Sequence, residues 1–155
     1  MSRHERYATR SLVYSKWHRF YLGDSEQMID LDGVEYCGVR GCNKPLCLIE
    51  TARDVGQSNK PTSVMRELAK QAGGMLAICV LYRIAEGIDD QLGCACEPRN
   101  VDQTCNHGIT RFRVRKVWPS PVRKWTVMTP EEFRDRLRAV RMNHLAAEHH
   151  TWEVA

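Results

Sequence analysis

The apolar segment Met75–Tyr82 limits the fold more than any other part of this sequence. It reads Met-Leu-Ala-Ile-Cys-Val-Leu-Tyr and contains no charged residue. A run of this length is far too short to cross a bilayer. Because side chains alternate between the two faces of a strand, a run that is apolar throughout predicts a central strand with helices on both sides. The sequence therefore predicts an α/β fold built around this strand.

Hydrophobic periodicity indicates the other elements. Alternating side chains predict strands at residues 28–36 and 110–118, and an apolar run after Pro45 predicts another at residues 46–50. Helical spacing and capping residues predict helices over three segments, residues 5–20, 62–72 and 129–147. The middle helix would return the chain from one strand to the next as a right-handed β-α-β crossover. We expect its apolar stripe to consist of Val64, Met65, Leu68 and Ala72.

The C-terminal helix has the clearest signals. Thr129 is a good N-cap and Pro130 suits the first helical position. Four apolar residues then recur at helical spacing: Phe133, Leu137, Val140 and Leu145. This helix is therefore expected to cover one face of the sheet.

Length and composition indicate one globular domain, residues 1–155, with 43% hydrophobic and 27% charged residues. The chain has seven cysteines, while residues 1–20 are polar and lack the apolar core of a secretory signal. Thiols without a secretory signal are expected to be reduced or to bind metal in the cytoplasm. No membrane partner is predicted.

Acidic side chains lie at two neighbouring strand ends. Asp30 and Asp32 share one face of the strand at 28–36, and Glu50 ends the next strand after a short glycine-containing turn. Carboxylates on paired strands lie about 5 Å apart when their parity matches. Mg²⁺ and Mn²⁺ accept such oxygen ligands and leave positions for water and phosphate. These residues therefore predict a divalent metal site.

The segments Ile-Asp-Leu-Asp-Gly-Val-Glu-Tyr and Pro-Leu-Cys-Leu-Ile-Glu, joined by a turn, resemble the metal-binding hairpin of PD-(D/E)XK nucleases. The style is close to that of short nuclease-like proteins encoded by phages of actinobacteria, which would place the protein in a host cell's cytoplasm. The resemblance covers roughly residues 5–83. It implies a restriction-endonuclease-like mixed sheet flanked by helices, Asp32 (or Asp30) and Glu50 as Mg²⁺ or Mn²⁺ ligands, and DNA cleavage.

The lysine of that family stands two residues after the second acid and orients or activates the attacking water. Here Ala52 occupies the position, and the adjacent Arg53 has the wrong parity and stays protonated. Lys70 or Gln71 on the following helix would replace the lysine. Ala52 also favours an alternative, a catalytically inactive protein on the same scaffold that binds nucleic acid or a host protein.

A Cys/His cluster lies in an insertion at residues 86–108. Its four candidate ligands are Cys94, Cys96, Cys105 and His107. Thiolates and imidazole are zinc ligands, and four of them make a structural site. Cys37 and Cys42, on the hairpin turn, are competing ligands. Cys47 and Cys79 lie within apolar strands and are expected in the core.

A basic segment follows the cluster. Residues 109–125 contain no acid, and their cations are Arg111, Arg113, Arg115, Lys116, Arg123 and Lys124. Such a stripe suits a phosphate backbone, and Trp118 and Trp125 could stack on exposed bases. DNA is therefore the expected partner. An enzyme that cuts both strands would commonly be a homodimer.

Overall fold

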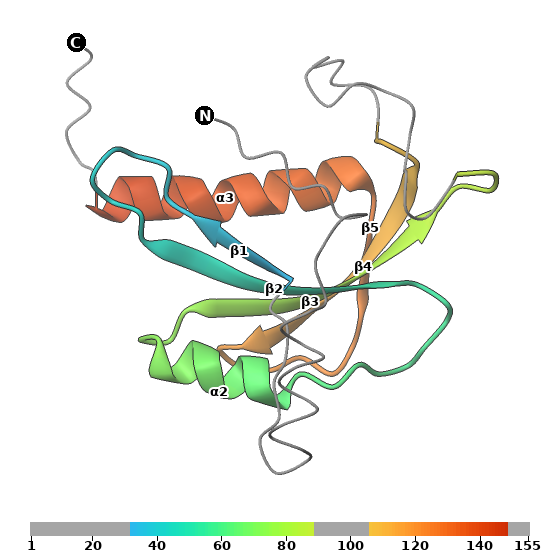
Figure 1. Ribbon diagram of the computed structural model, residues 1–155, viewed down its shortest axis with the longest axis horizontal. Helices are drawn as coiled ribbons and strands as arrows, with labels where there is room; N and C mark the ends of the chain where they lie inside the picture. The colour runs from blue at the N-terminus through green and yellow to red at the C-terminus, as the bar shows by residue number, and fades with distance from the viewer. Residues whose placement is uncertain (1–31, 89–105, 149–155) are drawn as a thin grey trace, which may run out of the picture.

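The computed structural model describes residues 32–88 and 106–148 (Figure 1). The predicted helix at 5–20 and residues 28–31 of the first predicted strand lie outside these ranges. In chain order the described elements are β1 (Gly33–Tyr36), β2 (Pro45–Arg53), α2 (Ser63–Gln71), β3 (Leu76–Ile84), β4 (Ile109–Trp118), β5 (Thr126–Met128) and α3 (Pro130–Glu148). The predicted α/β class is confirmed.

One mixed sheet organises the molecule, with strand order β1-β2-β3-β4-β5. The hairpin of β1 and β2 is antiparallel, while β2 and β3 are parallel and are connected through α2. The remaining neighbours, β3 with β4 and β4 with β5, are antiparallel. The predicted β-α-β connection therefore forms. β5 was not predicted, because its three residues are too few to show a period.

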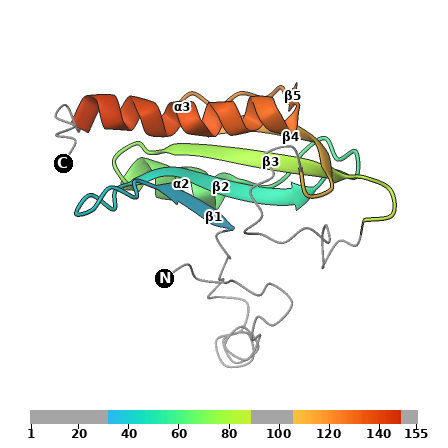
Figure 2. The same cartoon turned by 90° about the horizontal axis from the view of Figure 1, so that it is seen from above.

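The two helices lie on opposite faces of the sheet, α3 along one face and α2 against the other (Figures 1 and 2). β3 supplies both cores, as expected of a strand that is apolar throughout. Ala77 and Cys79 pack toward α2, whereas Ile78 and Val80 pack toward α3. The prediction of a central, doubly covered strand is confirmed.

Helix α3 forms as its sequence indicates. The Thr129 N–H donates to Glu132 Oε2 (2.8 Å), and the Glu132 N–H donates to Thr129 Oγ1 (3.2 Å). This reciprocal pair is a capping box. Phe133 and Leu145 are buried, which confirms the predicted apolar face.

Helix α2 differs from its predicted stripe. Met65 and Ala69 are its buried residues, while Val64 and Leu68 are 54% and 42% exposed. Met65 confirms one position of the predicted stripe, whereas Val64, Leu68 and Ala72 are exposed because the helix contacts the sheet through Met65 and Ala69. Gly73 and Gly74 follow the end of the helix at φ +85° and +82°, the left-handed conformation that glycine adopts at little cost.

Strand β2 continues three residues past Glu50, to Arg53. The extension forms because Thr51, Ala52 and Arg53 pair in parallel with β3. Glu50 therefore lies within a strand and not at its end. This places a stretch of paired backbone on both sides of the acid.

Candidate functional site

Two acids predicted as metal ligands, Asp32 and Glu50, lie opposite each other at the start of β1. Gly33 pairs with Ile49, so the register brings Asp32 opposite Glu50. Asp32 Oδ2 accepts hydrogen bonds from the Thr51 N–H (2.7 Å) and Thr51 Oγ1 (3.0 Å). Asp30 lies outside the described residues. Asp32 therefore lies beside the residue that follows Glu50, and the shared role of the two acids as metal ligands stays a prediction.

A lysine joins this pair from the loop that follows β2. Lys60 Nζ lies 2.6 Å from Glu50 Oε1 and donates to the Thr51 carbonyl at 3.0 Å. The two charged side chains are 22% and 20% exposed, so they are shielded but not sealed from water. Lys60 was missed by sequence reasoning, because only folding shows that a loop lysine returns to the strand.

The predicted replacements lie elsewhere. Lys70 Nζ is 2.8 Å from Glu67 Oε1 and 5.3 Å from the centre of the Trp118 ring. Gln71 is exposed at the C-terminal end of α2. Neither residue has a contact with Glu50 among the described residues. The structure thus places Lys60, and not Lys70 or Gln71, at the second acid.

Two acidic and two cationic side chains lie near the Cys79 thiol at this point of the sheet. Glu50 and Arg115 are its partners on the neighbouring strands β2 and β4. Burial raises the pKa of Cys79; the charges of Arg115 and Lys60 oppose this, while Glu50 and Asp32 add to it. The thiol therefore stays neutral, beside two carboxylates and two cations whose charges cancel.

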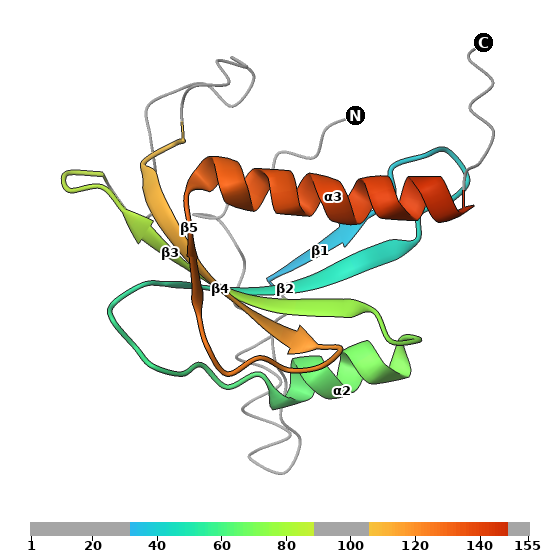
Figure 3. The same cartoon turned by 180° about the vertical axis from the view of Figure 1, so that it is seen from behind.

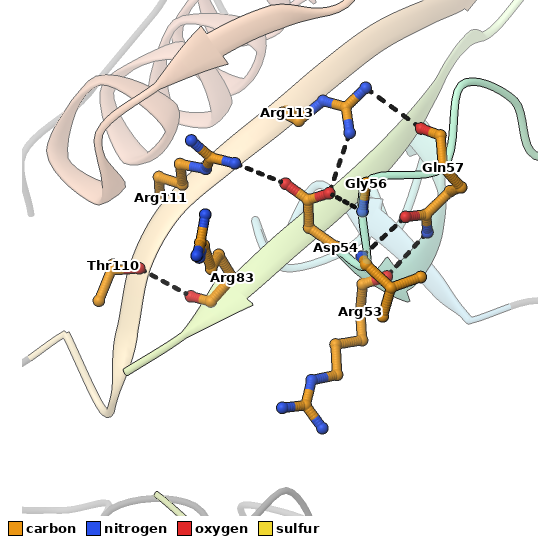
Figure 4. Close-up of polar contacts among 9 residues, drawn as sticks. Arg53, Asp54, Gly56, Gln57, Arg83, Thr110, Arg111 and Arg113 are labelled. Carbon is orange, nitrogen blue, oxygen red and sulfur yellow. Dashed lines mark hydrogen bonds and ion pairs between the residues drawn. The ribbon is translucent and has the colours of Figure 1, made fainter. Parts of the chain in front are cut away.

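The loop carrying Lys60 is anchored by a buried acid (Figure 4). Asp54 has a side chain only 2% exposed, and it contacts Arg113 Nη1 at 2.9 Å and Arg111 Nη2 at 3.3 Å. Its Oδ1 also accepts the Gly56 N–H at 3.1 Å. Burial favours a higher pKa for Asp54, but the hydrogen bonds from Gly56, Arg113 and Arg111 outweigh it and lower the pKa. The Asp54 carboxylate therefore stays charged to a lower pH than an ordinary Asp side chain.

Backbone carbonyls of the same loop accept bonds from β4 and from the segment before β5. The pairs are Arg113 Nη2 to Gln57 O (3.2 Å), Arg115 Nη2 to Lys60 O (3.2 Å) and Trp125 Nε1 to Ser58 O (2.9 Å). The guanidinium carbons of Arg113 and Arg115 also lie 5.2 and 4.7 Å from the Trp125 ring centre. These three side chains hold the loop in the position that brings Lys60 to Glu50.

The six predicted phosphate-binding cations do not share one surface. Arg111, Arg113 and Arg115 extend toward the loop, on the α2 side of β4. Lys116 and Lys124 line a cavity of about 560 Å³ beneath α3, together with apolar side chains. Arg123 is exposed before β5. Phosphate binding by these residues stays a prediction, and the structure gives Arg113 and Arg115 intramolecular roles.

A polar cleft opens beside Asp54 at the far ends of β2 and β3. Its volume is about 770 Å³, and its walls include Arg53, Arg83 and Arg111. Arg53 and Arg83 are exposed, and Figure 4 shows Arg53 pointing away from Asp54. Sequence reasoning missed Arg53 and Arg83 as binding residues, because they are separated by a helix in the chain. The lining of the cleft contains three arginines and two acids, Asp54 and Glu86. Arg53 lies three residues beyond Glu50 along β2.

A second group of side chains lies at the turn of the β1–β2 hairpin. Cys37, Cys42 and His144 each place one ligand atom within 4.8 Å of the others, a group that could hold a metal ion. Cys94, Cys96 and Cys105 of the predicted zinc site lie outside the described residues. His107 is exposed just before β4, at φ 50°. The described part of the chain therefore indicates the competing ligands Cys37 and Cys42, together with His144, which the sequence did not predict.

The other two thiols are core residues, as predicted. Cys47 and Cys79 are each fully buried. Burial, with a smaller contribution from the charge of Glu35, raises the pKa of Cys47 to about 12. Neutral buried thiols pack as small apolar side chains, so both serve as core residues.

Comparison with family models, curated proteins and solved structures found no match to this chain. None of the helices in residues 32–88 and 106–148 is long and apolar enough to cross a membrane. The candidate sites therefore depend on the geometry of this chain.

Proposed function

We propose that the protein is a Mg²⁺- or Mn²⁺-dependent DNA phosphodiesterase with its centre at Asp32, Glu50 and Lys60. The observation that carries the proposal is the 2.6 Å contact between Lys60 Nζ and Glu50 Oε1 beside a second acid. Two acids and a lysine are the residue types that the resemblance to PD-(D/E)XK nucleases implies. The mixed sheet flanked by helices supports the proposal without establishing that family's fold.

The donors fit a hard divalent cation. Asp32 and Glu50 present carboxylate oxygens from adjacent strands, and Mg²⁺ prefers oxygen ligands. When bound, the ion would neutralise charge on the phosphate and make its bound water more acidic. The soft ion expected from the cysteine content, Zn²⁺, would be held by thiols and imidazole elsewhere in the chain.

Lys60 would act through its remaining donor. A lysine ammonium has three N–H groups, and in the described structure two are used, on Glu50 Oε1 and the Thr51 carbonyl. The third is available to orient the attacking water or to contact a phosphate oxygen. Glu50 thus holds the ammonium in place while leaving it one donor for the reaction.

The polar cleft beside Asp54 would bind the phosphates next to the cleaved phosphate. Arg83 and Arg111, paired on β3 and β4, line it on the face of the sheet that carries Glu50. Arg53 also lines it, three residues or about 10 Å beyond Glu50 on β2, but on the opposite face of the strand. Guanidinium groups bind phosphate oxygens in a bidentate manner. The cleft would therefore position a DNA backbone whose next phosphates approach the acids.

The test is cleavage of plasmid, linear and branched DNA with Mg²⁺ or Mn²⁺. We expect Asp32→Ala, Glu50→Gln and Lys60→Met each to lower the rate by roughly 100-fold or more, the scale of a lost catalytic group. Lys70→Met is the matched control, since it removes a lysine of the same charge from α2, and it should cleave like the wild type. Lys60→Met cleaving as fast as Lys70→Met would refute the assignment of Lys60.

A relocated lysine gives a sharper test of the same centre. Ala52 has the same parity as Glu50 on β2, so Ala52→Lys places an ammonium on the same face of the strand. We expect Ala52→Lys to restore part of the cleavage lost in Lys60→Met. If the wild type cleaves none of the DNA substrates but binds them in a salt-dependent way, the non-catalytic binding protein becomes the better assignment.

A further inference from the structure

The hairpin turn brings two thiols to one point of the molecule. The Cys37 N–H donates to the Lys44 carbonyl (2.8 Å), and the Cys42 N–H donates to the Val39 carbonyl (3.0 Å). Gly41 at φ +86° and Asn43 at φ +48° adopt the left-handed conformation that closes this turn. Cys37 is fully buried and Cys42 is half-buried. The backbone therefore holds both cysteines within one closed turn.

Helix α3 brings an imidazole to the same point. The turn of the hairpin lies beside the C-terminal part of α3 (Figures 1 and 3). His144 is half-buried, and its Nε2 lies 3.4 Å from Cys42 Sγ although 102 residues separate them in the chain. The group thus connects the first two strands to the last helix.

We propose that Cys37, Cys42 and His144 bind a Zn²⁺ ion that fastens the β1–β2 hairpin to α3. Zn–S bonds of about 2.3 Å and Zn–N bonds of about 2.0–2.1 Å in a tetrahedron place neighbouring ligand atoms about 3.6–3.8 Å apart. The 3.4 Å contact and the 4.8 Å limit for the whole group are close to this spacing. Small side-chain rotations would therefore complete the geometry.

The donor types select zinc over the ion proposed for the carboxylates. Two sulfurs and one imidazole nitrogen are soft or borderline ligands, and Mg²⁺ and Mn²⁺ prefer oxygen. No carboxylate belongs to this group within the described ranges. Three protein ligands leave a fourth tetrahedral position for water or for another donor. The proposal is independent of the nuclease proposal, because the residues and the metal are different.

The first measurement is the zinc content of the purified full-length protein in reducing buffer. We expect one zinc per chain to be lost in Cys37→Ser/Cys42→Ser and in His144→Ala. Cys94→Ser/Cys105→Ser is the matched control, since it also removes two thiols but from the insertion, and it should retain that zinc. Full retention in the Cys37/Cys42 variant, with loss in the control, would overturn the assignment.

A second measurement avoids variants that fail to fold. Alkylation of the wild-type protein, mapped by mass spectrometry, should be slow at Cys37 and Cys42 with one equivalent of Zn²⁺ and at least tenfold faster after a zinc chelator. Co²⁺ in place of zinc should give thiolate-to-metal absorption and the visible bands of a tetrahedral site. Chelator-independent alkylation of both cysteines would overturn the proposal whatever the variants do.

Discussion

The two ends of the β1–β2 hairpin are built from opposite chemistry. Asp32 and Glu50, at the open end, present oxygen atoms and are balanced by a lysine that remains about one-fifth exposed. Cys37 and Cys42, at the turn, present sulfur atoms, and Cys37 is fully buried. Five residues along β1 separate the ends, about 16 Å at the ordinary rise of a strand.

This difference separates a centre suited to reaction from one suited to structural support. Hard ligands near solvent leave room for water and phosphate, whereas soft ligands, one of them fully buried, hold an ion between two elements. The open end also depends on a loop, 54–60, that β4 holds through side chains. The turn depends on α3. Disrupting the loop 54–60 should therefore affect the acids at the open end and not the cysteines at the turn. Disrupting α3 should have the reverse effect.

The largest expected effect on stability comes from the anchor of the loop. Asp54→Ala leaves Arg113, whose side chain is 17% exposed, without its carboxylate. We expect a loss of about 3 kcal/mol in the free energy of unfolding, as for other broken buried ion pairs, measured by urea unfolding. Asp135→Ala is the control, because Asp135 is 62% exposed and should change stability by less than about 1 kcal/mol. Equal effects would show that Asp54 does not anchor the loop.

The next effect distinguishes the two metals. A zinc-selective chelator should lower the melting temperature by roughly 5–10 °C, from about 2.7 kcal/mol of ligand stabilisation at a hundredfold excess of zinc over Kd. Added Mg²⁺ should not restore it. Cleavage measured well below the melting temperature should persist in the His144→Ala variant, since Lys60 and the acids are at the other end. If His144→Ala folds normally but no longer cleaves DNA, the two ends of the hairpin act as one functional unit.

A smaller effect is expected from one hydrogen bond of the loop. Trp125→Phe retains an aromatic ring for Arg113 and Arg115 but removes the donor to the Ser58 carbonyl. We expect about 1 kcal/mol of destabilisation, the ordinary value of such a bond, and slower cleavage, because Lys60 follows in the same loop. Tyr36→Phe, at a side chain that is 59% exposed, should leave both quantities near the wild-type values. An unchanged Trp125→Phe protein would show that the loop holds its position without this bond.

The smallest effect is confined to acid. The pKa of Asp54 is lowered in the folded protein, so its charge stabilises the fold fully above the ordinary Asp pKa of about 4. That contribution is lost as the pH falls through the lower, folded-state pKa. The difference in urea midpoint between the wild type and Asp54→Asn should therefore be constant at pH 5–7 and shrink below about pH 4. A difference that does not change with pH would contradict this role.

Most of the fold could be predicted from local patterns. The apolar run at 75–82 indicated a doubly covered strand, and Thr129 with Glu132 formed the capping box at the start of α3. Such features depend on neighbours a few residues away, so the sequence records them directly. Helix α2 shows the limit of such local prediction. Val64 and Leu68 are apolar but exposed, because the helix contacts the sheet through Met65 and Ala69.

The candidate sites also contain a part that local sequence predicts and a part that depends on tertiary packing. The sequence by itself determined the neighbourhood of Asp32 and Glu50, since a short turn between two strands leaves few registers. Only the tertiary structure decided that Lys60 reaches Glu50 and that His144 reaches Cys42. Both contacts join a strand or its turn to a segment whose position depends on the packing of other elements. Local periodicity contains no information about those distances, because they are set by how the helices and the loop pack on the sheet.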